Sequence, residues 1–122
     1  KVPLVDTRDV AQAAAVCLLN DQFDNQTFEI TGAQPVGYQE MADAISKATD
    51  RDINYVAIPP EAHNQALKEV GLPGWLADDL TGMSALWSQS TEHPPSPDFE
   101  KITGSKQYSV QDFGRDYAEV FS

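Results

Sequence analysis

With 122 residues, the chain is long enough to form one domain with a hydrophobic core. Its 19 acidic and 8 basic residues give a net charge of −11, which excludes the basic face that nucleic acid and anionic membranes require. No apolar run approaches the ~20 residues of a membrane-spanning helix, and a single cysteine, Cys17, cannot form an intramolecular disulfide. We therefore expect an acidic, cytoplasmic protein that binds neither nucleic acid nor membrane.

The first predicted elements are a short apolar run and a helix. Residues 2–5 could form a strand, placed at a sheet edge by its proline. Asp6 or Thr7 then caps a helix from Arg8 to Asn20. Apolar residues cover roughly 200° of this helix, so we expect more than one neighbour to bury it. Cys17 lies in the apolar face and is expected to be a buried structural thiol.

The second part of the chain alternates strands with a helix. Thr27–Gly32 is predicted to be a short strand closed by glycine, and Ile53–Ile58 a second one stopped by two prolines. Between them, Tyr38–Ala48 has the spacing of an amphipathic helix, with Gly37 as N-cap and Glu40 reaching back to it. A strand between two helices is one unit of an α/β layer and needs sheet neighbours.

The remaining predicted elements are helices. One runs from Pro60 to a stop at Gly71, and a longer one from Pro73 to about Ser90. A proline-rich loop over residues 91–97 precedes a short helical turn through Ile102. Ser109 then caps the last helix, whose buried stripe is predicted to run to Phe121. The chain is therefore predicted to be a single α/β domain spanning residues 1–122, mostly helical with two or three short strands.

The sequence contains none of the common catalytic or phosphate-binding motifs that we searched for. There is no glycine-rich phosphate loop, no Gly-x-Ser-x-Gly elbow and no Tyr-x-x-x-Lys pair. His63 and His93 lie in polar stretches and are expected to be solvated rather than metal-bound. Three carboxylate pairs are expected to be caps or surface charges, and they are Asp6 with Asp9, Glu40 with Asp43, and Asp78 with Asp79. We accordingly predict no catalytic, cofactor-binding or metal-binding residue in this chain.

Three large side chains in the helix after Pro73 could form a pocket wall for a flat or apolar ligand. They are Trp75, Met83 and Trp87. Residues 83 and 87 are one helical turn apart and so share a face. Ordinary core packing is the alternative role for all three.

Several segments, in chain order, resemble those of one family. The matching segments are Val5–Ala11 (V-D-T-R-D-V-A), Thr27–Gly32, Tyr38–Ala42, Tyr55–Pro59, Gly71–Pro73, Ile102–Gly104 and Tyr108–Tyr117. Together they resemble the carboxy-terminal part of NmrA-like atypical short-chain dehydrogenase/reductases, a group that includes NAD(P)H-dependent quinone reductases and redox-sensing regulators. No single segment is specific, but the ordered set covers almost the whole chain.

The resemblance implies that this chain is the carboxy-terminal, substrate-side portion of a Rossmann-type fold. Its partner would be a missing amino-terminal half that binds NAD(P), and its ligand a small molecule such as a quinone. None of the family's cofactor or catalytic residues can be carried onto this sequence. Two other readings stay open, namely part of an NADP-binding redox sensor without turnover, and a stand-alone module that self-associates through the apolar helix 8–20.

Overall fold

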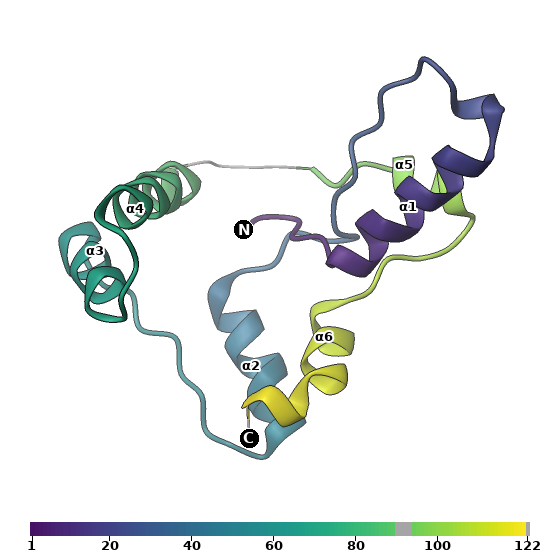
Figure 1. Cartoon of the computed structure of the whole chain (residues 1–122). Helices are drawn as coiled ribbons and strands as arrows, with labels where there is room; N and C mark the ends of the chain where they lie inside the picture. The colour runs from purple at the N-terminus through teal and green to yellow at the C-terminus, as the bar shows by residue number, and fades with distance from the viewer. Residues whose placement is uncertain (90–93, 122) are drawn as a thin grey trace. The chain divides into compact units, whose positions relative to one another are not determined.

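The computed structural model describes residues 1–89 and 94–121 (Figure 1). Contacts divide the chain into two compact units, which we call unit 1 (Lys1–Asn54 with His93–Ser122) and unit 2 (Tyr55–Glu92). The helices of unit 1 are α1 (Thr7–Leu19), η1 (Asp21–Phe23), α2 (Tyr38–Thr49), α5 (Asp98–Thr103), α6 (Val110–Asp116) and η2 (Ala118–Phe121). Those of unit 2 are α3 (Pro60–Glu69) and α4 (Gly74–Gln89).

The predicted helix starts are confirmed by their caps. The Asp6 carboxylate accepts the Arg8 N–H at 2.9 Å at the start of α1. At the start of α2, the Glu40 carboxylate accepts the Gly37 N–H at 2.6 Å. Ser109 caps α6 as predicted, and its side chain accepts the Asp112 N–H at 3.1 Å. Local side-chain chemistry therefore determines where these helices begin.

The last helix is shorter than predicted. α6 ends at Asp116, and the Tyr117 N–H bonds both the Phe113 and the Arg115 carbonyl before the 3₁₀ turn η2 begins. The tighter turn changes which residues face inward. Val120, predicted to be in the buried stripe, is 74% exposed.

The prediction of two or three strands is wrong for residues 1–89 and 94–121. Their only β pairing is one antiparallel bridge, in which the Val2 and Val36 backbones exchange hydrogen bonds of 3.0 and 2.9 Å. Residues 27–31 and 53–58 belong to no helix or strand. A strand is stable only as part of a ladder, and the described residues supply no ladder for these segments.

Unit 1 is held together by two helix contacts. α1 packs against α5, and α2 packs against α6 and η2 (Figure 1). Phe99 and Ile102 of α5 are its large buried apolar side chains. Gly114 is buried where α6 meets α2, and a Cβ there would lie 2.9 Å from the Ala44 carbonyl oxygen. Small residues therefore let the α2 and α6 backbones approach closely.

Unit 2 is a helical hairpin in which α3 packs against α4 (Figure 1). Lys68 of α3 forms an ion pair of 3.0 Å with Asp78 of α4, and Asn64 bonds the same carboxylate at 2.8 Å. Ala77 is the one fully buried residue among those described in this unit. Its outer surface keeps large apolar side chains exposed, including Trp75 at 67%.

Among the described residues, no helix combines the length and apolar character needed to cross a membrane.

Candidate functional site

The candidate site is a cavity of about 430 Å³ that lies within unit 1, hereafter the unit 1 cavity. Its walls come from residues 4–7, the loop 33–36, the start of α2, and residues 108–117. The apolar side chains in its lining are Leu4, Val5, Ala33, Pro35, Val36, Met41, Val110 and Phe113. Asp6, Glu40, Tyr108 and Tyr117 also line it. A mostly apolar cavity of this volume with a few polar groups has the character of a small-molecule site.

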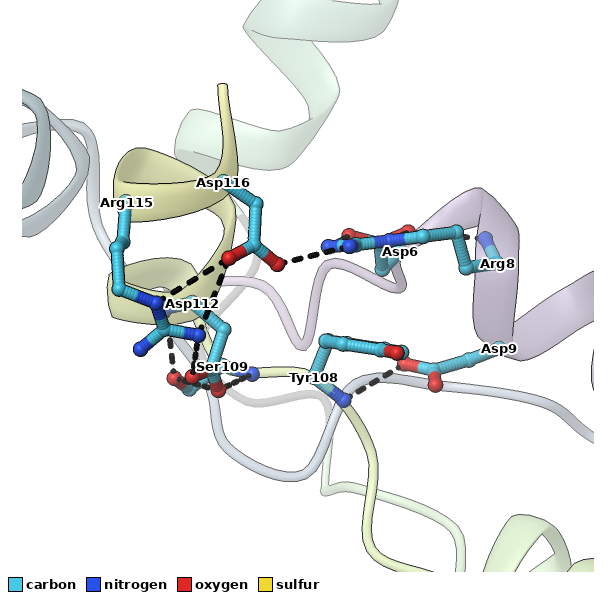
Figure 2. Close-up of polar contacts among 8 residues, drawn as sticks. All are labelled: Asp6, Arg8, Asp9, Tyr108, Ser109, Asp112, Arg115 and Asp116. Carbon is cyan, nitrogen blue, oxygen red and sulfur yellow. Dashed lines mark hydrogen bonds and ion pairs between the residues drawn. The ribbon is translucent and has the colours of Figure 1, made fainter. Parts of the chain in front are cut away.

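Arg8 does not line the cavity, but it contacts the lining residues Asp6 and Tyr108 (Figure 2). Its guanidinium bonds Asp6 through Nε at 3.0 Å and Nη2 at 2.8 Å, and Asp116 through Nη1 at 2.8 Å. The same group lies 3.8 Å from the centre of the Tyr108 ring. We call Asp6, Arg8, Tyr108 and Asp116 the Arg8 cluster. It ties the start of α1 to the end of α6.

Charge pairing in the Arg8 cluster shifts its ionisation equilibria. The Arg8 guanidinium lowers the pKa of Asp6 against the opposing effect of burial, and it lowers the pKa of Asp116 too. In return, Asp6 and then Asp116 raise the pKa of Arg8. All three groups are therefore charged at neutral pH.

Asp9 lies next to the cluster and is fully buried (Figure 2). Its Oδ2 accepts the Tyr108 N–H at 2.9 Å, which fixes the segment before α6 against α1. Its Oδ1 has no hydrogen-bond partner among the residues that the structure describes. Burial raises the pKa of Asp9, and the Tyr108 N–H offsets this only in part.

A second ion-pair group lies at α6 (Figure 2). Arg115 Nη2 bonds Asp112 at 2.8 Å, and Ser109 donates to the same carboxylate from both its hydroxyl and its backbone N–H. The Ser109 contacts, followed by that of Arg115, lower the pKa of Asp112 to about 2. This carboxylate therefore acts as a helix cap rather than as a proton carrier.

The predicted ligand contacts Trp75, Met83 and Trp87 all lie on α4 in unit 2. Trp75 and Met83 are exposed, and Trp87 is half-buried. None of them lines the unit 1 cavity, whose lining comes entirely from unit 1. Their role in ligand binding stays a prediction.

Other candidate reactive groups are isolated. Cys17 is a free thiol and is half-buried rather than fully buried as predicted. His63 is half-buried on α3, and His93 lies outside the described residues. Within the described parts of the chain, no group of three or more His, Cys, Asp and Glu side chains could hold a metal ion.

The helix starts of unit 1 do not fit a dinucleotide. A pyrophosphate binds where a helix offers free backbone N–H groups and a positive dipole end. Here Asp6, Glu40 and Asp112 already accept backbone N–H groups at the starts of α1, α2 and α6. Asp98 likewise lies in the first turn of α5. These carboxylates would repel a phosphate, so no cofactor contact is assigned to them.

The unit 1 cavity and the Arg8 cluster were missed by sequence reasoning. The V-D-T-R-D segment was interpreted as a helix cap and as part of the family resemblance, but no ligand site was predicted there. Its partners Tyr108 and Asp116 lie about a hundred residues further along the chain. The one available signal was that Arg8 falls on a helix otherwise apolar nearly all round.

The fold matches part of a solved reductase. The structure of the Citrobacter sp. triphenylmethane reductase complexed with NADP(H) superposes with a TM-score of 0.84 at 22% identity, over 96% of this chain and 40% of that chain. The chain thus has the fold of about two fifths of that structure.

The chain is also similar in sequence to parts of longer proteins. The chain is 32% identical over 121 residues to the NAD(P)H azoreductase of Xenophilus azovorans. This match covers 99% of this chain and 42% of that protein. It is 25% identical over 118 residues to the "Prestalk A differentiation protein A" of Dictyostelium discoideum. That match covers 97% of this chain and 38% of that protein. The chain thus spans about two fifths of the length of these relatives.

No protein-family model matches the chain. The relatives and the solved structure nevertheless confirm the predicted resemblance. The chain matches part of NAD(P)-dependent oxidoreductases, consistent with the carboxy-terminal part of an NmrA-like atypical short-chain dehydrogenase/reductase.

Proposed function

We propose that this chain is the substrate-side, cleft-covering part of an NAD(P)-dependent reductase, and that the parent protein transfers hydride to a small electrophile such as a quinone. The observation that carries the proposal is the 32% identity to an NAD(P)H azoreductase over 121 residues. The cofactor would supply the hydride, and this part would shape and close the cleft. The cofactor site would lie in an amino-terminal half that precedes this chain.

The outer face of α1 supports a missing neighbour. While Ala13 on the inner side is buried, Val10, Ala14 and Leu18 are exposed at a spacing of four residues, and Leu18 is 86% exposed. Ala11 and Ala15 lie beside them and are exposed too. This stripe carries no charge, although the chain is strongly acidic. Such a face is stable when another apolar surface covers it.

The exposed face of α4 is our candidate for the cleft wall. Trp75 and Met83 extend into solvent there, and Trp87 lies one turn from Met83 at the edge of that face. Aromatic and methionine side chains of this kind adapt to flat apolar ligands. We therefore propose these three as substrate contacts in the parent protein.

The test begins with the coding sequence upstream of Lys1 and the intact product that it encodes. We expect a glycine-rich dinucleotide turn in the added part, binding of NADH or NADPH, and steady-state reduction of quinones followed by nicotinamide absorbance. An intact product without a dinucleotide-binding half would contradict the proposal. So would one that binds neither nucleotide.

A redox sensor is the second candidate, and one relative favours it. The Dictyostelium protein is named for differentiation rather than for a reaction. A sensor would bind NADP and change its association with a partner protein, but it would not oxidise NADPH in the presence of quinones. Nucleotide binding with no turnover across several quinones would support this candidate over the reductase.

Self-association through residues 8–20 is the third candidate, and the exposed Leu18 favours it. It predicts a concentration-dependent dimer of this chain in light scattering after gel filtration. Leu18→Glu should abolish that dimer, whereas Gln12→Glu on the polar side of α1 should leave it intact. A chain that stays monomeric at every concentration would exclude this candidate.

A further inference from the structure

The unit 1 cavity is not among the substrate contacts proposed above, which all lie on α4. Its volume of about 430 Å³ falls within the ~300–1,000 Å³ of small-molecule sites. Four stretches separated in the sequence build its walls, so it is a product of the tertiary fold and not of one loop. It is therefore a candidate ligand site in its own right.

Ion pairs join two residues of the cavity lining, Asp6 and Glu40, to side chains outside it. The Arg8 cluster joins Asp6 to Asp116 on one side. On another side, Lys1 pairs with Glu40 at 2.6 Å, and Glu40 bonds the Gly37 N–H. A preformed cavity loses less conformational entropy when a ligand enters.

The charges in the lining exclude anionic ligands. Asp6 and Glu40 both line the cavity, and each already has a cationic partner. An anion entering here would find no lysine, arginine or histidine in the lining, and it would approach a chain of net charge −11. A cation would find those carboxylates already neutralised. A neutral ligand avoids both costs.

The rings in the lining favour a flat aromatic ligand. Tyr108, Phe113 and Tyr117 contribute aromatic surface, and Met41 adds a polarisable side chain. No hydrogen bond engages the Tyr108 or Tyr117 hydroxyl among the residues that the structure describes. Their two phenol hydroxyls are therefore our candidate donors to a carbonyl oxygen of the ligand.

We propose that the unit 1 cavity binds a neutral, flat, carbonyl-bearing aromatic molecule, of which a fused-ring quinone is the type. The proposal rests on the function proposed above, because such a quinone is the electrophile named there. It differs in assigning the ligand to residues of unit 1 instead of to Trp75, Met83 and Trp87 of α4.

Two matched probes test the charge argument. They are 2-(hydroxymethyl)anthraquinone, which is neutral, and anthraquinone-2-sulfonate, which is anionic. Neither has a free quinone position at which the Cys17 thiol could add. In ¹H–¹⁵N NMR titrations of the 122-residue chain, the neutral probe should shift the amide signals of residues 36–41 and 108–113, leaving those of α4 unchanged. The anion should bind about tenfold more weakly or worse.

Two matched variants test the position of the site. Val110→Trp fills the cavity and should weaken binding of the neutral probe by about tenfold. Val120→Trp adds the same side chain at a position outside the lining and should leave the affinity unchanged. Tyr117→Phe removes one hydroxyl without adding volume and should weaken binding severalfold, which keeps the test valid if Val110→Trp fails to fold.

Several results would overturn the proposal. They are no binding, equal affinity for the two probes, shifts centred on α4, and affinity unaffected by both Val110→Trp and Tyr117→Phe. Binding to this chain but not to the intact product would mean that polypeptide fills the cavity, which also overturns it. Failure of the proposed reductase would instead show as absent nucleotide binding by the intact product, and that measurement does not involve the cavity.

Discussion

Units 1 and 2 differ in the sequence distance over which their contacts form. In unit 1, Arg8 pairs with Asp116, and Asp9 accepts the N–H of Tyr108, so the ends of the chain are joined. In unit 2, α3 packs on the next helix, and its ion pair joins Lys68 to Asp78. Unit 1 therefore depends on contacts between residues far apart in the sequence, which must form together. Unit 2 is instead a local hairpin with little buried surface.

The two units can be followed separately in solution. Trp75 and Trp87 are the two tryptophans of the chain, and both belong to unit 2. Tryptophan fluorescence therefore reports on unit 2, while hydrogen exchange read by peptide mass reports on unit 1.

The largest expected effect is at the centre of unit 1. Phe99 is fully buried, so Phe99→Ala should lower the free energy of unfolding by about 3–5 kcal/mol. Trp75→Ala in unit 2 removes an exposed ring and should change it by less than about 0.5 kcal/mol. Urea titrations with both signals measure this. Equal losses in both signals would mean that the units unfold as one.

Two helical glycines should respond with opposite signs. Gly114→Ala places a Cβ 2.9 Å from the Ala44 carbonyl oxygen, so it should destabilise unit 1 by about 1–3 kcal/mol. Gly82→Ala on α4 meets nothing within 4 Å, so it should stabilise unit 2 by about 1 kcal/mol through helix propensity. Thermal and urea unfolding of the pair measure both. A gain in stability from Gly114→Ala would refute the close α2–α6 contact.

A smaller effect is expected at the start of α1. Asp6→Ala removes the N-cap and should lower the free energy of unfolding by about 1 kcal/mol. Asp6→Asn retains a capping oxygen but loses the charge that faces Arg8, so it should cost less. Urea titration of the two variants separates the cap from the ion pair. If both variants cost the same, the cap contributes nothing.

Acid should affect unit 1 more than unit 2. In unit 1 the pKa values of Asp6, Asp112 and Asp116 are all lowered, that of Asp112 to about 2, whereas in the described part of unit 2 only the pKa of Asp78 is clearly lowered. Lowered carboxyl pKa values stabilise the fold above the unfolded value of ~3.9 and lose this effect as pH falls through the folded values. Hydrogen exchange measured from the unfolded pKa of ~3.9 down to the lowered folded pKa values should show that the opening free energy of unit 1 falls more steeply with pH than that of unit 2. An equal loss of stability in both units as the pH falls would contradict this prediction.

Asp9 should have the opposite, and smallest, pH effect. Its pKa is raised, so the folded state binds a proton before the unfolded state does. As pH falls through this raised pKa towards ~3.9, Asp9 contributes a gain in stability. Asp9→Asn should remove that gain while keeping an acceptor for the Tyr108 N–H. A variant with an unchanged pH profile above pH ~4 would show that Asp9 is not the group responsible.

Local signals made the helices of both units predictable. Asp6, Glu40 and Ser109 mark helix starts by side-chain chemistry within three residues, and such signals can be read from sequence. The prediction of strands was wrong for a physical reason. Residues 27–30 and 53–58 have β-forming side chains, but a strand also needs a partner, and the described residues provide only the Val2–Val36 bridge.

The candidate site was beyond sequence reasoning. Trp75, Met83 and Trp87 could be chosen because their spacing on one helix is visible in the sequence. The unit 1 cavity brings residues 4–7 against residues 108–117, and nothing in either segment encodes that meeting. Charge pairing over such distances becomes visible only after folding, as with Arg8 and Asp116.

The extended segment 53–58 has a consequence for colloidal behaviour. Tyr55, Val56 and Ile58 expose an uncharged surface with high β-propensity, the composition of short segments that stack into fibrils. The charged residues 50–52 precede this segment and the prolines 59–60 follow it, and residues of both kinds oppose stacking of strands. These flanking residues act as aggregation gatekeepers. Replacing the two prolines should therefore make the chain precipitate sooner, even where folding is unaffected.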